Sequence, residues 1–369
     1  MAGLHNASMQ PEAAREVTPA DARDTADADL IVLRPNGLYC PAGDFYIDPW
    51  RPVDRAVITH AHADHARPGH RHYLCSTEGA GLLRARLGDV RLQTLAWGEA
   101  LHWQGVRLSL HPAGHVLGSA QVRVECRGQV WVASGDYFST GSGERNPSCT
   151  AFEALRCHCF ITESTFGLPI YRWRPQAEVL ADINTWWQHN ADAHRPSLLM
   201  AYSLGKAQRL LAGVDASIGP VLVHGAVEPL NQAYRAAGVL LAPCLPADQA
   251  TTREAWSRAL IIAPPAVHGS AWARRFGDFS DAFASGWMQL RGARRRQGVD
   301  RGFVLSDHAD WPGLQTAIRA TGAERIIVTH GYEAVMVRWL REQGLQAGSF
   351  RTEFGDAAVE ADAQSASST

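Results

Sequence analysis

The sequence predicts a layered α/β protein in which a second domain interrupts the first. From residue 30 to about residue 165, short apolar runs of β type alternate with Gly, Pro and Asp turns, a density typical of a sheet-rich domain. From residue 171, strand-like and helix-like segments alternate, as they do around parallel sheets. The β-type pattern then returns. The simplest assignment is one domain formed by residues 30–170 and 302–354, with an inserted α/β domain at residues 171–301.

The individual elements follow from the same patterns. In the first part we expect one helix at 78–87 and strands at 31–33, 45–47, 56–59, 106–111, 121–125, 129–133 and 159–162. In the insert we expect helices at 175–189 and 205–212 and strands at 196–200, 219–223 and 259–262. Further strands are expected at 302–305 and 325–329. The polar segments 1–29 and 355–369 are expected to be a disordered leader and a disordered tail.

Composition limits the classes of function. A chain of 369 residues with 46% hydrophobic residues can bury a large core. Its formal net charge of −2 gives no global positive field, so any contact with nucleic acid must come from a local patch. Seven cysteines without a CxxC pair indicate reduced thiols. No apolar stretch is long enough for a membrane span, so we expect a cytoplasmic protein without a membrane partner.

A tract rich in metal-binding side chains, His60-Ala-His62-Ala-Asp64-His65, follows the apolar run 55–59. His60 and His62 point the same way if the strand continues, because strand side chains repeat every two residues. The alternative is a group of surface histidines near a turn. Three imidazoles and a carboxylate within six positions are more than folding requires, and they indicate a metal centre.

Four further segments place a potential ligand at the end of an apolar strand. They carry His115, Asp136, His308 and His330. Taken singly, each is a weak signal, because a lone histidine at a strand end is commonly a hydrogen-bonded structural residue. Together with the first tract they supply five histidines and two aspartates for metal, with His308 to spare. That mixed set suits zinc or manganese.

With these motifs the chain closely resembles the metallo-β-lactamase superfamily, and within it the β-CASP nucleases, over roughly residues 30–354. Members of that group have an αββα sandwich, into which a β-CASP domain is inserted between the fourth motif and the last histidines. The matching positions are Asp48 for the first motif, His60, His62, Asp64 and His65 for the second, His115 for the third, Asp136 for the fourth, Glu163 for motif A, His308 for motif B and His330 for motif C.

The resemblance implies a two-metal phosphodiesterase with two divalent ions, Zn²⁺ or alternatively Mn²⁺. One ion would be held by His60, His62 and His115, the other by Asp64, His65 and His330, with Asp136 between them. The catalytic residues implied are His308, Glu163, Asp64 and Asp136. His308 would protonate the leaving oxygen, and Glu163 would fix its tautomer. Asp48 would support a ligand histidine without contacting the metal itself.

The motifs leave two nucleic-acid substrates open. A histidine at motif C is the pattern of RNA-processing and prokaryotic members. The amino-acid sequences of segments 38–50, 161–173 and 201–209 are similar to those of bacterial ligase-associated DNA exonucleases. These enzymes are named for a gene neighbourhood with an ATP-dependent DNA ligase and a helicase. The resemblance therefore implies a DNA exonuclease for end processing or repair, with an RNA-processing ribonuclease as the alternative. A small-molecule metallohydrolase would lack the long insert, and a non-catalytic scaffold would have lost ligands.

Basic residues outside these motifs allow two interpretations. Ser203 and Lys206, the only lysine in the chain, could open a helix that binds a phosphate. The alternative is an ordinary Ser cap with a surface lysine. The arginine cluster at 291–301 could track a nucleic-acid backbone or form a solvated loop. His224, His268 and the Cys157-His158-Cys159 tract are interpreted as structural.

Overall fold

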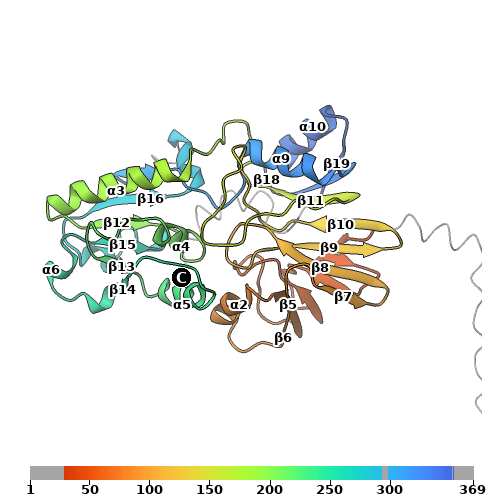
Figure 1. Cartoon of the computed structure of the whole chain (residues 1–369), viewed down its shortest axis with the longest axis horizontal. Helices are drawn as coiled ribbons and strands as arrows, with labels where there is room; N and C mark the ends of the chain where they lie inside the picture. Colours follow the sequence, from red (N-terminus) through yellow and green to blue (C-terminus); the bar gives the residue numbers. More distant parts are fainter. Residues whose placement is uncertain (1–28, 293–297, 351, 353–369) are drawn as a thin grey trace, which may run out of the picture.

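The computed structural model describes residues 29–292, 298–350 and 352, and the described residues form three sheets (Figure 1). The predicted tail and, apart from residue 29, the predicted leader lie outside them. The first sheet has the order β1-β2-β3-β4-β5-β6. Its strands are β1 (Val32–Arg34), β2 (Gly37–Cys40), β3 (Phe45–Ile47), β4 (Arg55–Val57), β5 (His72–Ser76) and β6 (Leu92–Leu95).

The second sheet has the order β19-β18-β11-β10-β9-β8-β7. Its strands are β7 (Ala100–Trp103), β8 (Val106–Pro112), β9 (Ala120–Cys126), β10 (Gln129–Ala133), β11 (Cys159–Ser164), β18 (Arg325–Gly331) and β19 (Gln346–Ser349). Strand β11 is buried along its whole length between β10 and β18, and both of these pairings are parallel. A parallel strand covered on both faces reads as a continuous apolar run, which is why this segment is recognisable in the sequence.

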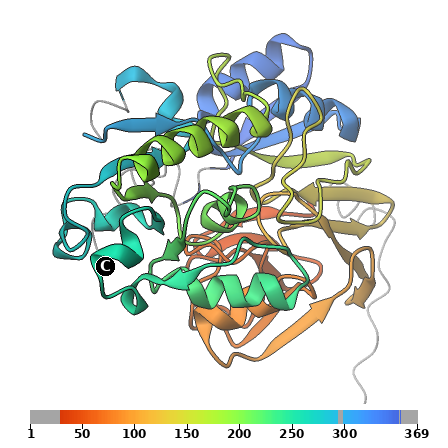
Figure 2. The ribbon, with the colours of Figure 1, turned by 60° about the vertical axis from the view of Figure 1, so that its left-hand side comes forward.

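The first two sheets pack face to face. Leu38, Ile47 and Val57 of the first sheet share one core with Leu110, Val124 and Ile161 of the second. Helices α9 (Trp311–Thr321) and α10 (Glu333–Glu342) cover the outer face of the second sheet. Helices α2 (Ala80–Leu87) and α5 (Glu228–Ala236) cover the outer face of the first (Figure 1 and Figure 2). The layers therefore run helix, sheet, sheet, helix, which confirms the predicted mixed α/β class.

The third sheet is parallel throughout, with the order β14-β13-β15-β12-β16-β17. Its strands are β12 (Ser197–Met200), β13 (Val221–Val223), β14 (Leu245–Pro246), β15 (Leu260–Ala263), β16 (Ser280–Ala284) and β17 (Arg301–Phe303). Because β17 pairs with β16, this sheet continues to Phe303, slightly beyond the predicted end of the insert. The domain limits themselves stay a prediction.

Helices cover both faces of the third sheet. One face packs against α3 (Gln176–Asp192) and α4 (Lys206–Leu211). In α3 the buried residues Val179, Leu180, Ile183, Trp186 and Trp187 recur at helical spacing and form its inner stripe. The other face is covered by short segments, which are η1 (Ala247–Gln249), α6 (Arg253–Trp256), η2 (Pro265–Val267), α7 (Ala271–Arg274) and η3 (Gly286–Gln289). No described helix is long and apolar enough to cross a membrane.

Candidate metal centre and adjoining pocket

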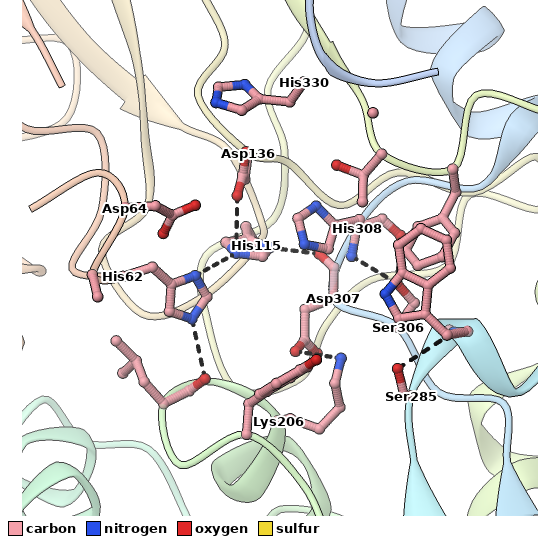
Figure 3. A pocket seen from close by; sticks show the side chains of 18 residues that line it. His62, Asp64, His115, Asp136, Lys206, Ser285, Ser306, Asp307, His308 and His330 are labelled. Atoms are coloured by element: carbon pink, nitrogen blue, oxygen red, sulfur yellow. Dashed lines mark hydrogen bonds and ion pairs between the residues drawn. The ribbon is translucent and has the colours of Figure 1, made fainter. Parts of the chain in front are cut away.

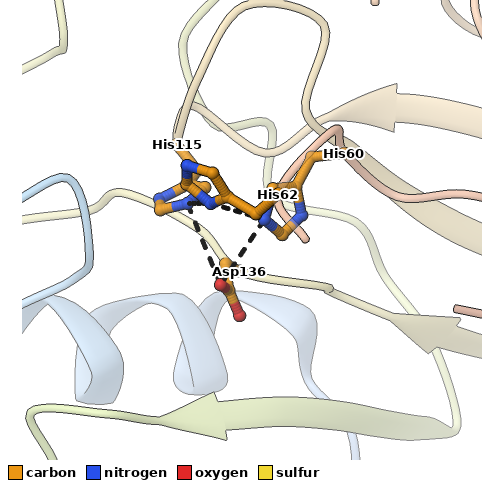
Figure 4. Close-up of side chains that lie close together, drawn as sticks. All are labelled: His60, His62, His115 and Asp136. Atoms are coloured by element: carbon orange, nitrogen blue, oxygen red, sulfur yellow. Dashed lines mark hydrogen bonds and ion pairs between the residues drawn. The ribbon is translucent and has the colours of Figure 1, made fainter. Parts of the chain in front are cut away.

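The predicted ligands come together from loops at strand ends of the first two sheets. The second-motif tract follows β4, His115 follows β8, Asp136 follows β10, and His330 lies at the end of β18. Figure 4 shows that the imidazoles of His60, His62 and His115 and the Asp136 carboxylate converge on one point. The donor atoms of His60, His62, His115 and Asp136 all lie within 4.8 Å of one another.

Each of the three imidazoles uses one nitrogen to donate a hydrogen bond away from this point. His60 Nδ1 lies 3.1 Å from Thr59 Oγ1, whose own proton goes to Asp48. His62 Nε2 lies 3.2 Å from the carbonyl oxygen of Leu204, and His115 Nδ1 lies 2.8 Å from that of Asp307. Carbonyl oxygens only accept, and the Thr59 hydroxyl already gives its proton to Asp48. These three nitrogens therefore carry the protons, and the other nitrogen of each ring holds a lone pair.

Those three lone pairs face one another. His62 Nδ1 lies 2.9 Å from His60 Nε2 and 3.1 Å from His115 Nε2. Asp136 Oδ2 lies 3.6 Å from His60 Nε2 and 3.8 Å from His115 Nε2. Burial, as the first cause, lowers the pKa of His60 and His115 well below the usual value, so both rings are neutral. Neutral imidazoles beside a carboxylate are the donor set of a divalent transition metal, and these residues fit such an ion.

A second group of predicted ligands adjoins the first through Asp136. His65 Nδ1 lies 2.7 Å from Asp48 Oδ2, which directs His65 Nε2 toward Asp136 Oδ2 at 3.3 Å and Asp64 Oδ2 at 3.5 Å. That nitrogen is buried and makes no hydrogen bond among the described residues. The His330 ring lies 5.5 Å from the His65 ring, centre to centre.

The carboxylates around His65 carry negative charge that a bound cation would balance. Burial on its own would lower the pKa of His65, but Asp136, Asp64 and Asp48 together hold it well above the usual value. Burial likewise opposes ionisation of Asp136, yet His65 and its neighbours keep the pKa of that carboxyl well below its ordinary range. A buried imidazole nitrogen that faces two carboxylates therefore also fits a bound divalent ion, which would take the place of the proton on Nε2.

His308 stands beside the cluster with its own carboxylate. Its Nδ1 lies 2.9 Å from Glu163 Oε2 and 3.1 Å from Oε1, and Tyr137 N donates to the same Oε1 at 2.7 Å. Donor atoms of Asp136, Glu163 and His308 also lie within 4.8 Å of one another. Both Glu163 oxygens already accept hydrogen bonds, so we assign Glu163 to holding His308 rather than to metal. His308 Nε2 is the ring nitrogen that does not face Glu163.

The third sheet reaches this site through a buried ionic network. Lys206 Nζ lies 2.7 Å from Asp307 Oδ2, with both side chains 5% exposed, and Arg209 Nη1 lies 3.3 Å from Asp307 Oδ1. Arg209 also donates to the Ser306 carbonyl and to Gln176. The alternative of a Ser cap with a surface lysine is wrong, because Gly205 precedes the first residue of α4 and Lys206 is buried. Phosphate binding by Ser203 and Lys206 stays a prediction.

A pocket of about 230 Å³ opens over these residues (Figure 3). One side is lined by predicted ligands and by His308, and the other by loops of the third sheet. Sequence patterns did not predict a role in the site for Asp307 or for the residues that those loops contribute, which include Tyr202, Ser285 and Trp287. Asp307 had a signal, since it stands directly before His308 and can pair with the single lysine. The loop residues had none, because loops after strands of another sheet reach the site only through the tertiary fold.

The remaining candidates lie outside this pocket. The His224 ring packs against Trp272 at 4.7 Å, and His268 Nε2 lies 3.4 Å from Asp281. Burial raises the pKa of Cys157 and Cys159 to about 12 each, so neither thiol ionises near neutral pH. Of the arginine cluster, residues 294–296 lie outside the described residues.

Comparisons connect this chain with several known proteins, although no family model matches the sequence. It is 34% identical over 316 residues to a protein named Probable DNA ligase from Opitutus terrae, which covers 85% of this chain and 30% of that protein. It is 31% identical over 127 residues to Endoribonuclease YSH1 from Candida albicans, covering 34% of this chain and 14% of that protein. Cleavage and polyadenylation specificity factor 73 from Drosophila melanogaster is 28% identical over 125 residues, covering 34% and 18%.

A solved structure of a protein of unknown function from Enterococcus faecalis V583 superposes with a TM-score of 0.50 at 11% identity, covering 82% of this chain and 80% of that one. That likeness concerns the fold alone. The chain spans less than a third of the length of the curated relatives named above. Over their matched parts, this chain is therefore similar to proteins named for joining DNA and for cutting RNA.

Proposed function

We propose that this chain is a metal-dependent nuclease of the metallo-β-lactamase superfamily, within its β-CASP group, and that it hydrolyses phosphodiester bonds in DNA from an end. The observation that carries the proposal is the set of three inward lone pairs on His60, His62 and His115 beside Asp136. Such an arrangement is repulsive without a cation. The layer order and the third sheet support the αββα sandwich with a β-CASP insert at residues 171–301.

Two divalent ions, Zn²⁺ or Mn²⁺, are proposed for the two groups of ligands. His60, His62 and His115 would hold one ion, Asp64, His65 and His330 the other, and Asp136 would contact both. Asp48 supports the second site, because it fixes the proton of His65 on Nδ1 and leaves Nε2 for metal. When bound, such ions activate a water molecule and offset the negative charge that develops on phosphoryl oxygens.

The chain's own residues supply the proton and the orientation. His308 would donate a proton from Nε2 to the leaving oxygen, because Glu163 occupies its Nδ1. Glu163 also accepts from Tyr137 N, so its position is fixed from two directions. The carbonyl oxygens of Leu204 and Asp307 orient His62 and His115 from the third-sheet side of the pocket. Productive geometry would therefore depend on both halves of the chain.

The choice of DNA rests on similarity over most of the chain. The relative that aligns with 85% of it is named a DNA ligase, and an ATP-dependent DNA ligase and a helicase are the functional partners we propose. The alternative substrate is RNA. It is favoured by the shorter match to an endoribonuclease and by the histidine at position 330.

The experiment is digestion of end-labelled 20-mers of single-stranded DNA, duplex DNA and RNA with Zn²⁺ or Mn²⁺. We expect the DNA to be shortened stepwise from one end, and a chelator to stop the reaction. Faster digestion of the RNA would replace the DNA assignment with the ribonuclease. No cleavage of any polymer with either metal would refute the nuclease itself.

A further inference from the structure

Aromatic side chains form one wall of the pocket beyond His308. The ring of Phe166 lies edge-on to that of His308 at 6.0 Å, and the Trp287 ring lies 4.6 Å from that of Phe166. Tyr171 meets Trp287 edge-on at 5.9 Å. Figure 3 shows Ser306 and Ser285, which flank this wall, on the His308 side of the pocket and away from His62 and Asp64. Trp287 is therefore one ring away from the proposed proton donor.

Trp287 differs from the tryptophan that packs on the same phenylalanine. The indole N–H of Trp173 donates to the His308 carbonyl at 2.9 Å, so this side chain is fully used in holding the loop. The indole N–H of Trp287 donates to no residue that the structure describes, and the side chain is only partly buried while it lines the pocket. Buried tryptophans usually find an acceptor. The part of Trp287 that lines the pocket is thus available to a ligand.

The backbone that carries Trp287 is held in place before any ligand binds, and its ring packs on Phe166 and Tyr171. Ser285 caps η3 by accepting a hydrogen bond from Trp287 N at 3.3 Å. Gly286 is packed so closely that a Cβ atom there would lie 2.5 Å from Phe166 and 3.0 Å from the Cβ of Ser306. A rigid aromatic surface loses little conformational entropy when a planar group stacks on it.

We propose that Trp287 stacks on the nucleobase of the nucleotide that carries the leaving oxygen, an inference that rests on the proposed nuclease function. His308 faces that oxygen, and Trp287 lies on the same side of the pocket. An indole face binds any base without reading its edge, which suits an enzyme that must remove every nucleotide. A pocket of about 230 Å³ is smaller than the roughly 300–1,000 Å³ of typical ligand sites, so it suits one unpaired nucleotide rather than a duplex.

The test measures single-turnover cleavage of the first bond that the wild type cuts in a labelled single-stranded 20-mer, as DNA and as RNA. An abasic tetrahydrofuran residue replaces the nucleotide on either the 5′ or the 3′ side of that bond. Loss of one stacked base should slow the wild type roughly 5- to 150-fold when the abasic residue is on the leaving-group side, and much less on the other side. This measurement needs no variant.

The variants identify the stacking partner. Trp287→Ala should slow cleavage of the normal strand by a similar factor. On the abasic strand the variant should be only slightly slower than the wild type, because the substitution and the missing base remove the same contact. Trp287→Phe should keep most of the activity. Trp103→Ala removes a tryptophan that is 40% exposed outside this pocket and serves as the control, which should cleave like the wild type.

Two results would overturn the stacking proposal while leaving the nuclease intact. One is a wild type that cleaves normal and abasic strands equally. The other is a Trp287→Ala variant that slows cleavage of the abasic strand by the same factor as cleavage of the normal strand. That result would show that Trp287 has a structural role and does not contact the base. Absence of cleavage by the wild type would instead refute the proposed function.

Discussion

At the scale of single residues, Asp136 is the point where the two groups of proposed ligands meet. Its Oδ2 lies 3.3 Å from His65 Nε2 and 3.6 Å from His60 Nε2. Its third histidine partner is His115, and no other carboxylate of the described residues forms ion pairs with three of the clustered histidines. Removing it should therefore disturb both metal sites together.

Asp136→Ala should abolish turnover and lower the metal content below the two ions per chain that we propose, while the fold persists. Elemental analysis and far-UV circular dichroism check the two statements. Asp89→Ala, at an exposed turn, is the matched control and should keep both ions. An active Asp136→Ala protein would contradict the assignment.

His308→Ala tests the proton donor separately from the metals. We expect the chemical step to slow by about 10²–10⁴-fold, the usual contribution of a positioned acid. Both ions should stay bound, since Glu163 rather than a metal holds His308 Nδ1. A nitrophenyl phosphodiester has a leaving group that needs no proton, so its cleavage should slow far less than the cleavage of DNA. Equal losses on the two substrates would exclude His308 as the acid.

The same scale shows what the sequence can and cannot reveal about the site. The candidate ligands were recognisable because each stands at the end of an apolar run, and strands that end at one edge of a sheet bring their loops together. The partners of those ligands were not recognisable. His62 and His115 are oriented by carbonyl oxygens of Leu204 and Asp307, and any residue type supplies a carbonyl.

At the scale of elements, α4 is a short helix held in place by tertiary contacts. It has six residues, all buried, and isolated helices shorter than about 12–15 residues are marginal in water. The sequence predicted this helix to within one residue at each end, because its apolar positions mark it. It did not predict that Lys206 and Arg209 would both turn inward to Asp307, because the pairing depends on where the loop before α9 lies.

Asp307→Asn should therefore destabilise the protein strongly, by about 3–5 kcal/mol, because it leaves two buried cations without their carboxylate. Thermal or denaturant unfolding measures the change. Asp278→Asn is the control: Asp278 is 87% exposed and pairs with Arg195, and such surface pairs contribute about 0–1 kcal/mol. A change for Asp307→Asn as small as that of the control would show that the network does not hold the site together.

Helix α5 shows a second limit at this scale. Its buried Leu230 and Tyr234 pack in the core under the first sheet, and Tyr234 Oη accepts a hydrogen bond from Leu117 N at 3.1 Å. An apolar stripe on a helix predicts that the helix is covered, but it does not say by which sheet. The segment that the sequence assigns to an insert therefore closes a layer of the other part.

At the scale of the whole molecule, the charge distribution bears on how a nucleic acid is held. A formal net charge of −2 provides no global positive field, and Lys206 and Arg209, two of the cations near the pocket, are paired with Asp307. If these paired side chains contribute little, we expect few phosphates to be neutralised at once. The slope of log affinity against log salt is about −0.7 per neutralised phosphate for single strands, so we expect a shallow slope.

A protein that contacts few phosphates depends for binding on the part of the strand that enters the pocket. A free end can enter the pocket without bending of the strand. A closed circular single-stranded DNA should therefore resist digestion, and the same circle cut once should be degraded at the rate of a linear strand. Gel analysis of the two forms with Mn²⁺ or Zn²⁺ makes the comparison, with equal mass of DNA in each. Nicking of the intact circle would show that internal nucleotides reach the metal centre, and would replace the exonuclease with an endonuclease.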